Sequence, residues 1–321
     1  MKSWWRKAPA AANDERLNAQ AGGAERALRR LEWTVIRRLD GLLQGDYRTL
    51  MRGTGLDLAD LREYQHHDDV RHIDWNVTAR LQEPYVREYL EDREVTAWFL
   101  LDLSRSIDFG SNVKKASIAA DFVAVLARLL TSHGNRVGAM LYGDKVEGVV
   151  PAKNGRRHVL HILHRMNERV PEAEGRGTDL EAFLKTAMRT LRRRSLVFIV
   201  SDFISLPGWE RPLLHLAQRH EVIAVRLHDP LEAELPDLGL VVFQDAETGE
   251  QVFVDTHDKG FRERFAAEAA KREAEIRQAF AQSGVDALEL STDADIVDTV
   301  IRFAALRKRR RGGRLHDLRV A

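Results

Sequence analysis

Three oxygen-bearing side chains follow one strongly apolar stretch of the sequence at alternating positions. Residues 95–101 are mostly apolar, with β-branched and aromatic members, and the stretch runs into Asp102, Ser104 and Ser106. Hard oxygen ligands at the end of a buried parallel strand are what a small divalent cation needs. Taken alone, the three residues are explained better by a turn and a helix cap, because Asp and Ser favour both.

Two residues from later in the chain are expected at the same place in the fold. Residues 195–203 form a second buried apolar stretch that contains Asp202 near its end, and Thr178 opens the helix before it. The carboxyl ends of adjacent parallel strands line one crevice, so both residues should join the first three. Two carboxylates and three hydroxyls suit Mg²⁺ or Mn²⁺, which keep several bound waters.

This set of five resembles, in order and in place, the metal-ion-dependent adhesion site of von Willebrand factor A-type domains. The matching residues are Asp102, Ser104, Ser106, Thr178 and Asp202. The resemblance covers roughly residues 96–300. It implies that both serines and the threonine touch or closely approach the metal, while the two aspartates act largely through bound waters. It also implies an open coordination position that takes a Glu or Asp of a partner protein.

The segment before this region resembles one bacterial family, number fifty-eight in the domain-of-unknown-function series. The likeness rests on Leu61-Arg-Glu-Tyr64, Asp68-Asp69-Val70-Arg71-x-Ile73-Asp74-Trp75, Ala79-Arg80 and Val86-Arg87-Glu88-Tyr89. Members look like von Willebrand A-type proteins paired with MoxR-type AAA+ ATPases. Two departures are His66-His67, where the family usually has Pro-Gly, and Asp57, where a Glu is common.

The elements that must position these residues alternate between strand and helix after residue 95, which predicts an α/β fold with a doubly wound, mostly parallel sheet. Strands are expected at 95–102, 136–142, 146–150, 195–203, 222–227 and 287–290, and a β-hairpin at 241–254. Helices are expected at 114–130, from near 155, from 178, at 210–220, at 261–280 and from 295. The basic run 307–311 is expected to be the solvated end of the last helix.

The domain organisation has four parts. Residues 1–23 are expected to be a mobile leader, 24–95 an N-terminal helix and a small charged subdomain, 96–305 the von Willebrand factor A-like domain, and 306–321 a basic tail. Within 24–95, strands near 56–64 and 84–89 should pair, held by ion pairs and by Trp75.

The ionisable run from His66 to Asp74 leaves a second function open. Its histidines and aspartates are possible ligands of a metallo-hydrolase acting on phosphoesters or peptides. Ion pairs between its aspartates and neighbouring arginines are favoured, because adjacent His-His and Asp-Asp cannot all face one point on a strand. The sequence has no Gly-x-Ser-x-Gly elbow and no phosphate-binding loop of the Walker type, so we expect no enzymatic activity.

Composition narrows the class of protein. The 321 residues carry 50 basic and 49 acidic side chains, and this balance argues against a dedicated nucleic-acid binder. There are no cysteines, and no apolar run approaches the roughly 18 residues of a membrane span. We expect a cytoplasmic, metal-dependent protein-binding module, an adaptor or co-chaperone of a MoxR-type AAA+ ATPase. A purely structural scaffold with an unoccupied metal site is the remaining alternative.

Overall fold

The computed structural model describes residues 61–65, 70, 73, 75–87, 95–143, 145–168, 178–244 and 251–317. They fall in two compact units, one within Arg52–Val95 and one within Thr96–Ala321, each of which is taken by itself. The expected leader, the expected helix at 24–43 and most of the run from His66 to Asp74 lie outside the described residues.

The small unit contains two short strands and one helix. Strand β1 (Leu61–Glu63) pairs antiparallel with β2 (Tyr85–Arg87), and helix α4 (Trp75–Leu81) lies between them in the chain. The pairing of these two segments confirms the expected antiparallel strands. Trp75, however, is 68% exposed at the start of α4, so the expectation that its ring holds the unit together is wrong. The buried apolar residue among those described is Val86.

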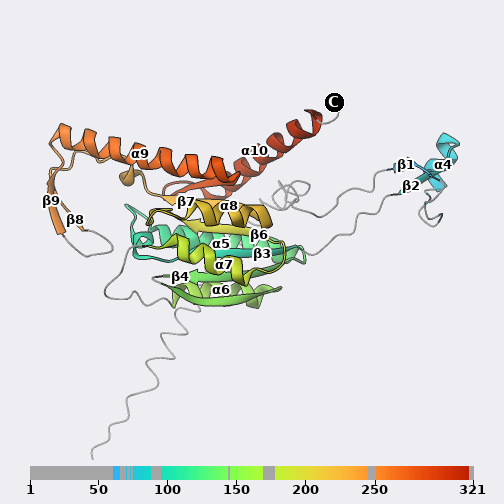
Figure 1. Cartoon of the computed structure of the whole chain (residues 1–321), viewed down its shortest axis with the longest axis horizontal. Coiled ribbons are helices and arrows are strands. Elements are labelled where there is room, and N and C mark those ends of the chain that lie inside the picture. Colours follow the sequence, from blue (N-terminus) through green and yellow to red (C-terminus); the bar gives the residue numbers. More distant parts are fainter. Residues whose placement is uncertain are drawn as a thin grey trace, which may run out of the picture. The chain divides into compact units, whose positions relative to one another are not determined.

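The large unit is built on a six-stranded sheet in the order β10-β7-β6-β3-β4-β5 (Figure 1). The strands are β3 (Thr96–Asp102), β4 (Arg136–Tyr142), β5 (Val146–Lys153), β6 (Leu196–Ser201), β7 (Glu221–His228) and β10 (Asp286–Ser291). All neighbours are parallel except β4 and β5. The expected α/β class with a mostly parallel sheet is thereby confirmed.

Helices cover both faces of this sheet, which is why its central strands are apolar on both sides. They are α5 (Lys115–Ser132), α6 (Arg156–Asn167), α7 (Leu180–Thr190), α8 (Glu210–Arg219), α9 (Lys259–Ser283) and α10 (Ile296–Asp317), with short 3₁₀ turns η3 (Arg105–Asp108) and η4 (Pro230–Glu232). Helices α7, α8 and the end of α9 share one core cluster with β3, β4, β6 and β7. On the opposite face, Phe122 of α5 packs edge-on against Phe198 of β6.

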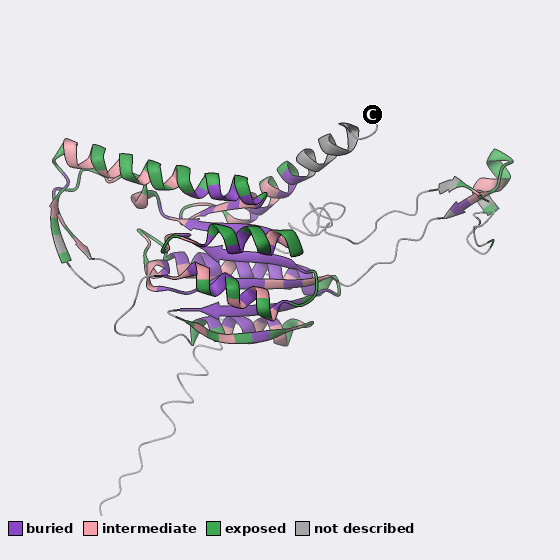
Figure 2. Cartoon of the chain, in the orientation of Figure 1, coloured by how far each residue is buried: buried purple, intermediate pink, exposed green. Residues whose placement is uncertain are grey.

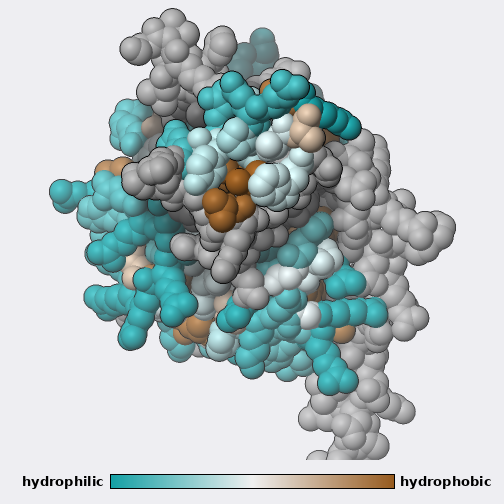
Figure 3. All heavy atoms as spheres, turned by 90° about the vertical axis from the view of Figure 1, so that its right-hand side faces the viewer, coloured by the Kyte–Doolittle hydropathy of each residue, from teal (hydrophilic) through white to brown (hydrophobic). Residues whose placement is uncertain are grey.

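Burial follows these layers. The central strands β3, β4, β6 and β7 are buried almost throughout, whereas the helices are exposed on their outer sides (Figure 2). On the face drawn in Figure 3, hydrophilic side chains cover most of the described surface. Within the described part of the chain, no helix combines the length and apolarity that crossing a membrane requires.

Two details differ from the sequence prediction. Helix α7 begins at Leu180 rather than Thr178, because Asp179 is the N-cap and its carboxylate accepts a 2.9 Å hydrogen bond from Ala182 N. Arg307, expected in a solvated run, is buried and binds Asp286 through Nε at 2.7 Å and Glu221 through Nη2. This arginine therefore attaches α10 to the first residues of β10 and β7.

The expected hairpin follows β7 and precedes α9 in the chain, and it forms a separate two-stranded sheet. Strand β8 (Leu240–Gln244) pairs antiparallel with β9 (Gln251–Asp255). Leu240, Val242 and Phe253 are each more than half exposed. Since Val242 pairs with Phe253 and side chains alternate along a strand, all three lie on one face of the hairpin.

Candidate functional site

The site begins where β3 ends. Asp102 is the last residue of β3 and is almost fully buried. Its Oδ1 accepts a 3.0 Å hydrogen bond from Ser104 N, and its Oδ2 accepts a 2.6 Å hydrogen bond from Ser201 Oγ. Ser201 is the last residue of the neighbouring strand β6, so the carboxylate joins the ends of two parallel strands. Two donors hold it in one orientation.

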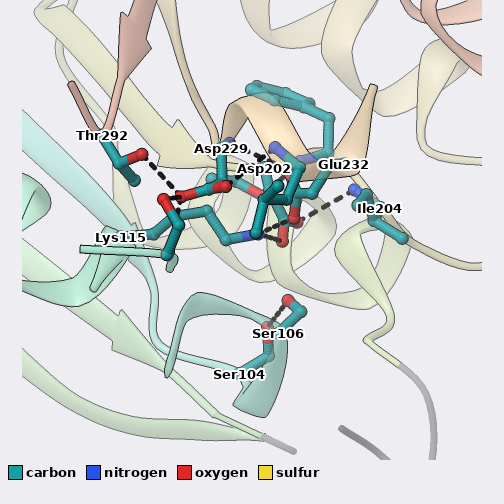
Figure 4. Close-up of polar contacts among 12 residues, drawn as sticks. Ser104, Ser106, Lys115, Asp202, Ile204, Asp229, Glu232 and Thr292 are labelled. Atoms are coloured by element: carbon teal, nitrogen blue, oxygen red, sulfur yellow. Dashed lines mark hydrogen bonds and ion pairs between the residues drawn. The ribbon is translucent and has the colours of Figure 1, made fainter. Parts of the chain in front are cut away.

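The two serines after β3 place their hydroxyls together. Ser104 Oγ and Ser106 Oγ are 3.1 Å apart (Figure 4). Ser104 occupies the N-cap position of η3, but its side chain makes no capping hydrogen bond. A helix cap therefore explains the backbone of this stretch, but it does not explain why the two hydroxyls lie together.

Thr178 lies at the same edge of the sheet, just before α7. It is buried, and its carbonyl accepts hydrogen bonds from Ser205 Oγ at 2.7 Å and Leu206 N at 3.0 Å. Ser205 Oγ also accepts a 3.0 Å hydrogen bond from Leu180 N. These contacts fix the start of α7 against the loop that follows Asp202.

Asp202, which directly follows β6, carries an ion pair that the sequence analysis missed. Its Oδ2 lies 2.7 Å from Lys115 Nζ, and its Oδ1 accepts a 3.0 Å hydrogen bond from Ile204 N. Lys115 also donates to Glu232 Oε1 at 2.7 Å (Figure 4). The side chains of Lys115 and Asp202 are each 1% exposed. A buried ammonium thus stands between two carboxylates.

A signal for Lys115 was present in the sequence. In the expected helix, Ile118, Ala119 and Phe122 form the buried stripe, and Lys115 lies three, four and seven positions before them. These spacings place the lysine on the same face of the helix. A lysine on an apolar stripe near the end of a parallel strand needs a buried acidic partner, because an unpaired buried ammonium is too costly.

Burial and charge shift two pKa values here. Burial, together with the negative charge of Asp202, raises the pKa of Asp102 to about 6, although hydrogen bonds from Ser201 and Ser104 act in the opposite direction. Burial alone lowers the pKa of Lys115, but the carboxylates of Asp202 and Glu232 outweigh it, so that pKa lies above its ordinary value. Lys115 is therefore charged at neutral pH, whereas Asp102 is a buried carboxyl that feels the negative charge of Asp202.

A third buried carboxylate, Asp229, follows β7 and stabilises the same edge of the sheet. It accepts hydrogen bonds from Ser111 N at 2.8 Å, Ser111 Oγ at 3.0 Å and Thr292 Oγ1 at 2.6 Å. Burial raises the pKa of Asp229, but these hydrogen bonds outweigh burial and lower it. Asp229 also caps η4, where its N–H donates to Glu232 Oε2 at 3.1 Å. Glu232 therefore bridges the Asp229 cap and Lys115.

The donor set can be tested against the divalent cation that the sequence predicts. In the part of the chain that the structure describes, no three His, Asp or Glu side chains gather around one point, so a cation here would depend on hydroxyls as well as carboxylates. Neighbouring ligands on an octahedral Mg²⁺ at about 2.1 Å lie about 3.0 Å apart. The 3.1 Å between the hydroxyls of Ser104 and Ser106 matches this spacing. The residues present fit a small, oxygen-seeking cation.

The five predicted residues thus gather at one edge of the sheet, on the ends of β3 and β6 and at the start of α7. The structure adds three residues that were not predicted. Ser201 bonds Asp102, Lys115 bonds Asp202, and Glu232 bonds Lys115. The alternative site at His66 to Asp74 lies almost wholly outside the described residues, so the hydrolase hypothesis remains a prediction.

Comparisons with known proteins place the chain in a family. The model of the family "Protein of unknown function DUF58" matches residues 60–275. Uncharacterized proteins of Mycobacterium bovis and Mycobacterium tuberculosis are each 40% identical over 285 residues, covering 88% of this chain and 89% of the relative.

Two solved structures are also similar. An aerotolerance-related membrane protein from Bacteroides fragilis has a TM-score of 0.43 at 13% identity, covering 66% of this chain and 98% of its own. The conserved hypothetical protein BatB from Bacteroides thetaiotaomicron has a TM-score of 0.42 at 12% identity, covering 67% and 99%. On the strength of the family match and of the mycobacterial relatives, the chain belongs to the DUF58 family.

Proposed function

We propose that this chain is a metal-dependent protein-binding module of the von Willebrand factor A type. The observation that carries the proposal is the pair of serine hydroxyls 3.1 Å apart at the end of β3, beside the buried carboxylates of Asp102 and Asp202. Hydroxyls that cap no helix, next to a buried carboxylate whose pKa is raised by burial and by a second carboxylate, suit a bound cation.

Each residue has a distinct part in this proposal. The hydroxyls of Ser104, Ser106 and Thr178 would hold Mg²⁺ or Mn²⁺ directly, while Asp102 and Asp202 would act largely through waters. A bound cation supplies an open position for a carboxylate oxygen. The partner or client would then contribute one Glu or Asp side chain, and the surrounding loops would decide which protein is accepted.

The partner we propose is a MoxR-type AAA+ ATPase, for which the chain would be an adaptor or co-chaperone. This part of the proposal rests on the likeness of the segment around Leu61 to Tyr89 and not on any contact in the structure. It includes no catalytic step by this chain.

Binding of a divalent cation and of the partner tests the proposal. Isothermal titration of the full chain with Mn²⁺ should show one site, lost in Asp102→Ala and kept in Ser132→Ala, an exposed helix residue. A pull-down of the MoxR-type ATPase from the same organism should weaken with EDTA and with Asp102→Ala. Equal capture with and without chelator would contradict the metal-dependent mechanism.

A second candidate, a scaffold whose metal site is closed, is favoured by one contact. Lys115 already neutralises Asp202 inside the protein. This alternative predicts no thermal shift on adding Mg²⁺ or Mn²⁺. The hydrolase alternative predicts turnover by the purified protein that is lost in His67→Ala or Asp69→Ala.

A further inference from the structure

Lys115 is the buried cation of the site, and its surroundings are unusual for a lysine. Its ammonium lies 2.7 Å from Asp202 Oδ2 and 2.7 Å from Glu232 Oε1, and its side chain is 1% exposed. Lysine is almost never fully buried unless it is paired. The chain has therefore placed a fixed positive charge within hydrogen-bond distance of Asp202, one of the five residues proposed to hold the cation.

Two consequences follow for any cation that binds at Ser104 and Ser106. The ammonium repels it, because it is bonded directly to Asp202 of the proposed site and like charges interact strongly where little water screens them. The ammonium also occupies Asp202 Oδ2, while Ile204 N occupies Oδ1. Both effects lower the affinity of the site for a free divalent cation.

Glu232 acts in the opposite direction. Its Oε1 binds Lys115, and its Oε2 accepts a hydrogen bond from Asp229 N, so the cap of η4 holds this carboxylate in place. The negative charge of Glu232 partly offsets the positive charge of the ammonium. Cation affinity should therefore depend on a residue 117 positions away from Lys115 in the chain.

We infer that Lys115 is the affinity-determining residue of this site, a built-in counter-cation that keeps the binding of free Mg²⁺ or Mn²⁺ weak. This inference rests on the proposed function and deepens it. With weak intrinsic affinity, the cation is held well only when the acidic side chain of the partner completes its coordination. Metal and partner then bind together rather than in succession.

The test compares three variants of the full chain by isothermal titration with MnCl₂ at neutral pH. Lys115→Met should bind Mn²⁺ at least about ten-fold more tightly than the wild type, because it removes the repulsion and frees Asp202 Oδ2. Glu232→Gln should bind several-fold more weakly, because the ammonium loses its second partner while the cap to Asp229 N keeps an acceptor. Lys114→Met, which removes the exposed neighbouring lysine, should stay within about two-fold of the wild type.

Thermal unfolding gives a second reading if Lys115→Met is unstable without metal. The variant leaves Asp202 and Glu232 without their cation, so saturating Mn²⁺ should raise its Tm by more than that of the wild type. If Lys115→Met does not fold at all, the inference is tested by whether Glu232→Gln binds Mn²⁺ more weakly than the wild type does.

Equal Mn²⁺ affinity in Lys115→Met and Lys114→Met would overturn this inference and leave the proposed function standing. No binding by any variant would overturn the proposed function, and this inference with it.

Discussion

Ser201 Oγ donates a 2.6 Å hydrogen bond to Asp102 Oδ2, and so joins the last residue of β6 to the last residue of β3. In Ser201→Ala the buried carboxylate loses a donor that no other group replaces. We expect a loss of about 1–3 kcal/mol in the free energy of unfolding, measured by urea denaturation. Ser132→Ala, at an exposed position, should change it by less than about 0.5 kcal/mol. Equal stability of the two variants would mean that the Ser201 contact contributes nothing.

The raised pKa of Asp102 predicts a pH dependence in metal-free buffer. Its pKa is about 6 in the folded chain, raised by burial and by Asp202 from the ordinary value of 3.8. The folded state therefore binds the proton more tightly than the unfolded state, and the free energy of unfolding falls as the pH rises from about 4 to about 6. Asp102→Asn cannot titrate and should lack this fall, which amounts to at most about 3 kcal/mol.

Urea denaturation in EDTA at several pH values measures the effect. Asp108→Asn, at a side chain that is 40% exposed, is the control and should follow the wild-type curve. Identical pH curves for Asp102→Asn and the wild type would contradict the assignment of the titration to Asp102.

The contribution of the buried Asp229 carboxylate to stability can be tested through its hydrogen bond from Thr292. Thr292→Val keeps the shape of the side chain but removes the 2.6 Å hydrogen bond to the buried carboxylate. We expect a loss of about 1–3 kcal/mol by denaturation and a pKa of Asp229 that moves back up toward its ordinary value. Thr299→Val should lose less, because the Thr299 hydroxyl is exposed and bonds Asp295 O and Arg302 Nη2 rather than a buried carboxylate. A smaller loss of unfolding free energy in Thr292→Val than in Thr299→Val would contradict a stabilising role of the contact between Thr292 and Asp229.

The buried ion pair of Arg307 predicts that the last helix contributes to stability. Arg307→Met leaves Asp286 and Glu221 at the sheet edge without their cation. Breaking such a pair from one side costs about 3–5 kcal/mol. Arg302→Met, on the exposed side of the same helix, should cost less than about 0.5 kcal/mol. Guanidinium unfolding that gives the same midpoint for both variants would show that Arg307 is not a structural residue.

Much of the large unit could be predicted because its strands are buried on both faces. Such strands are continuous apolar runs, and the helices between them show apolar residues three and four positions apart, so the sequence predicted the order of strands and helices. The small unit was harder, because few of its residues are apolar. Trp75 was expected inside for its size, but a unit this small offers little core to cover it.

The sequence by itself determined that the carboxylates of Asp102 and Asp202 would lie at one edge of the sheet. Asp102 and Asp202 follow buried parallel strands, and such strands end at one edge of a sheet whatever the rest of the chain does. Only the tertiary structure decided which groups pair there. Ser201 lies beside Asp102 because Leu101 pairs with Val200, and Lys115 meets Glu232 because η4, which follows β7, contacts the first residue of α5. Strand register and loop conformation depend on packing across the whole unit, and no local pattern encodes them.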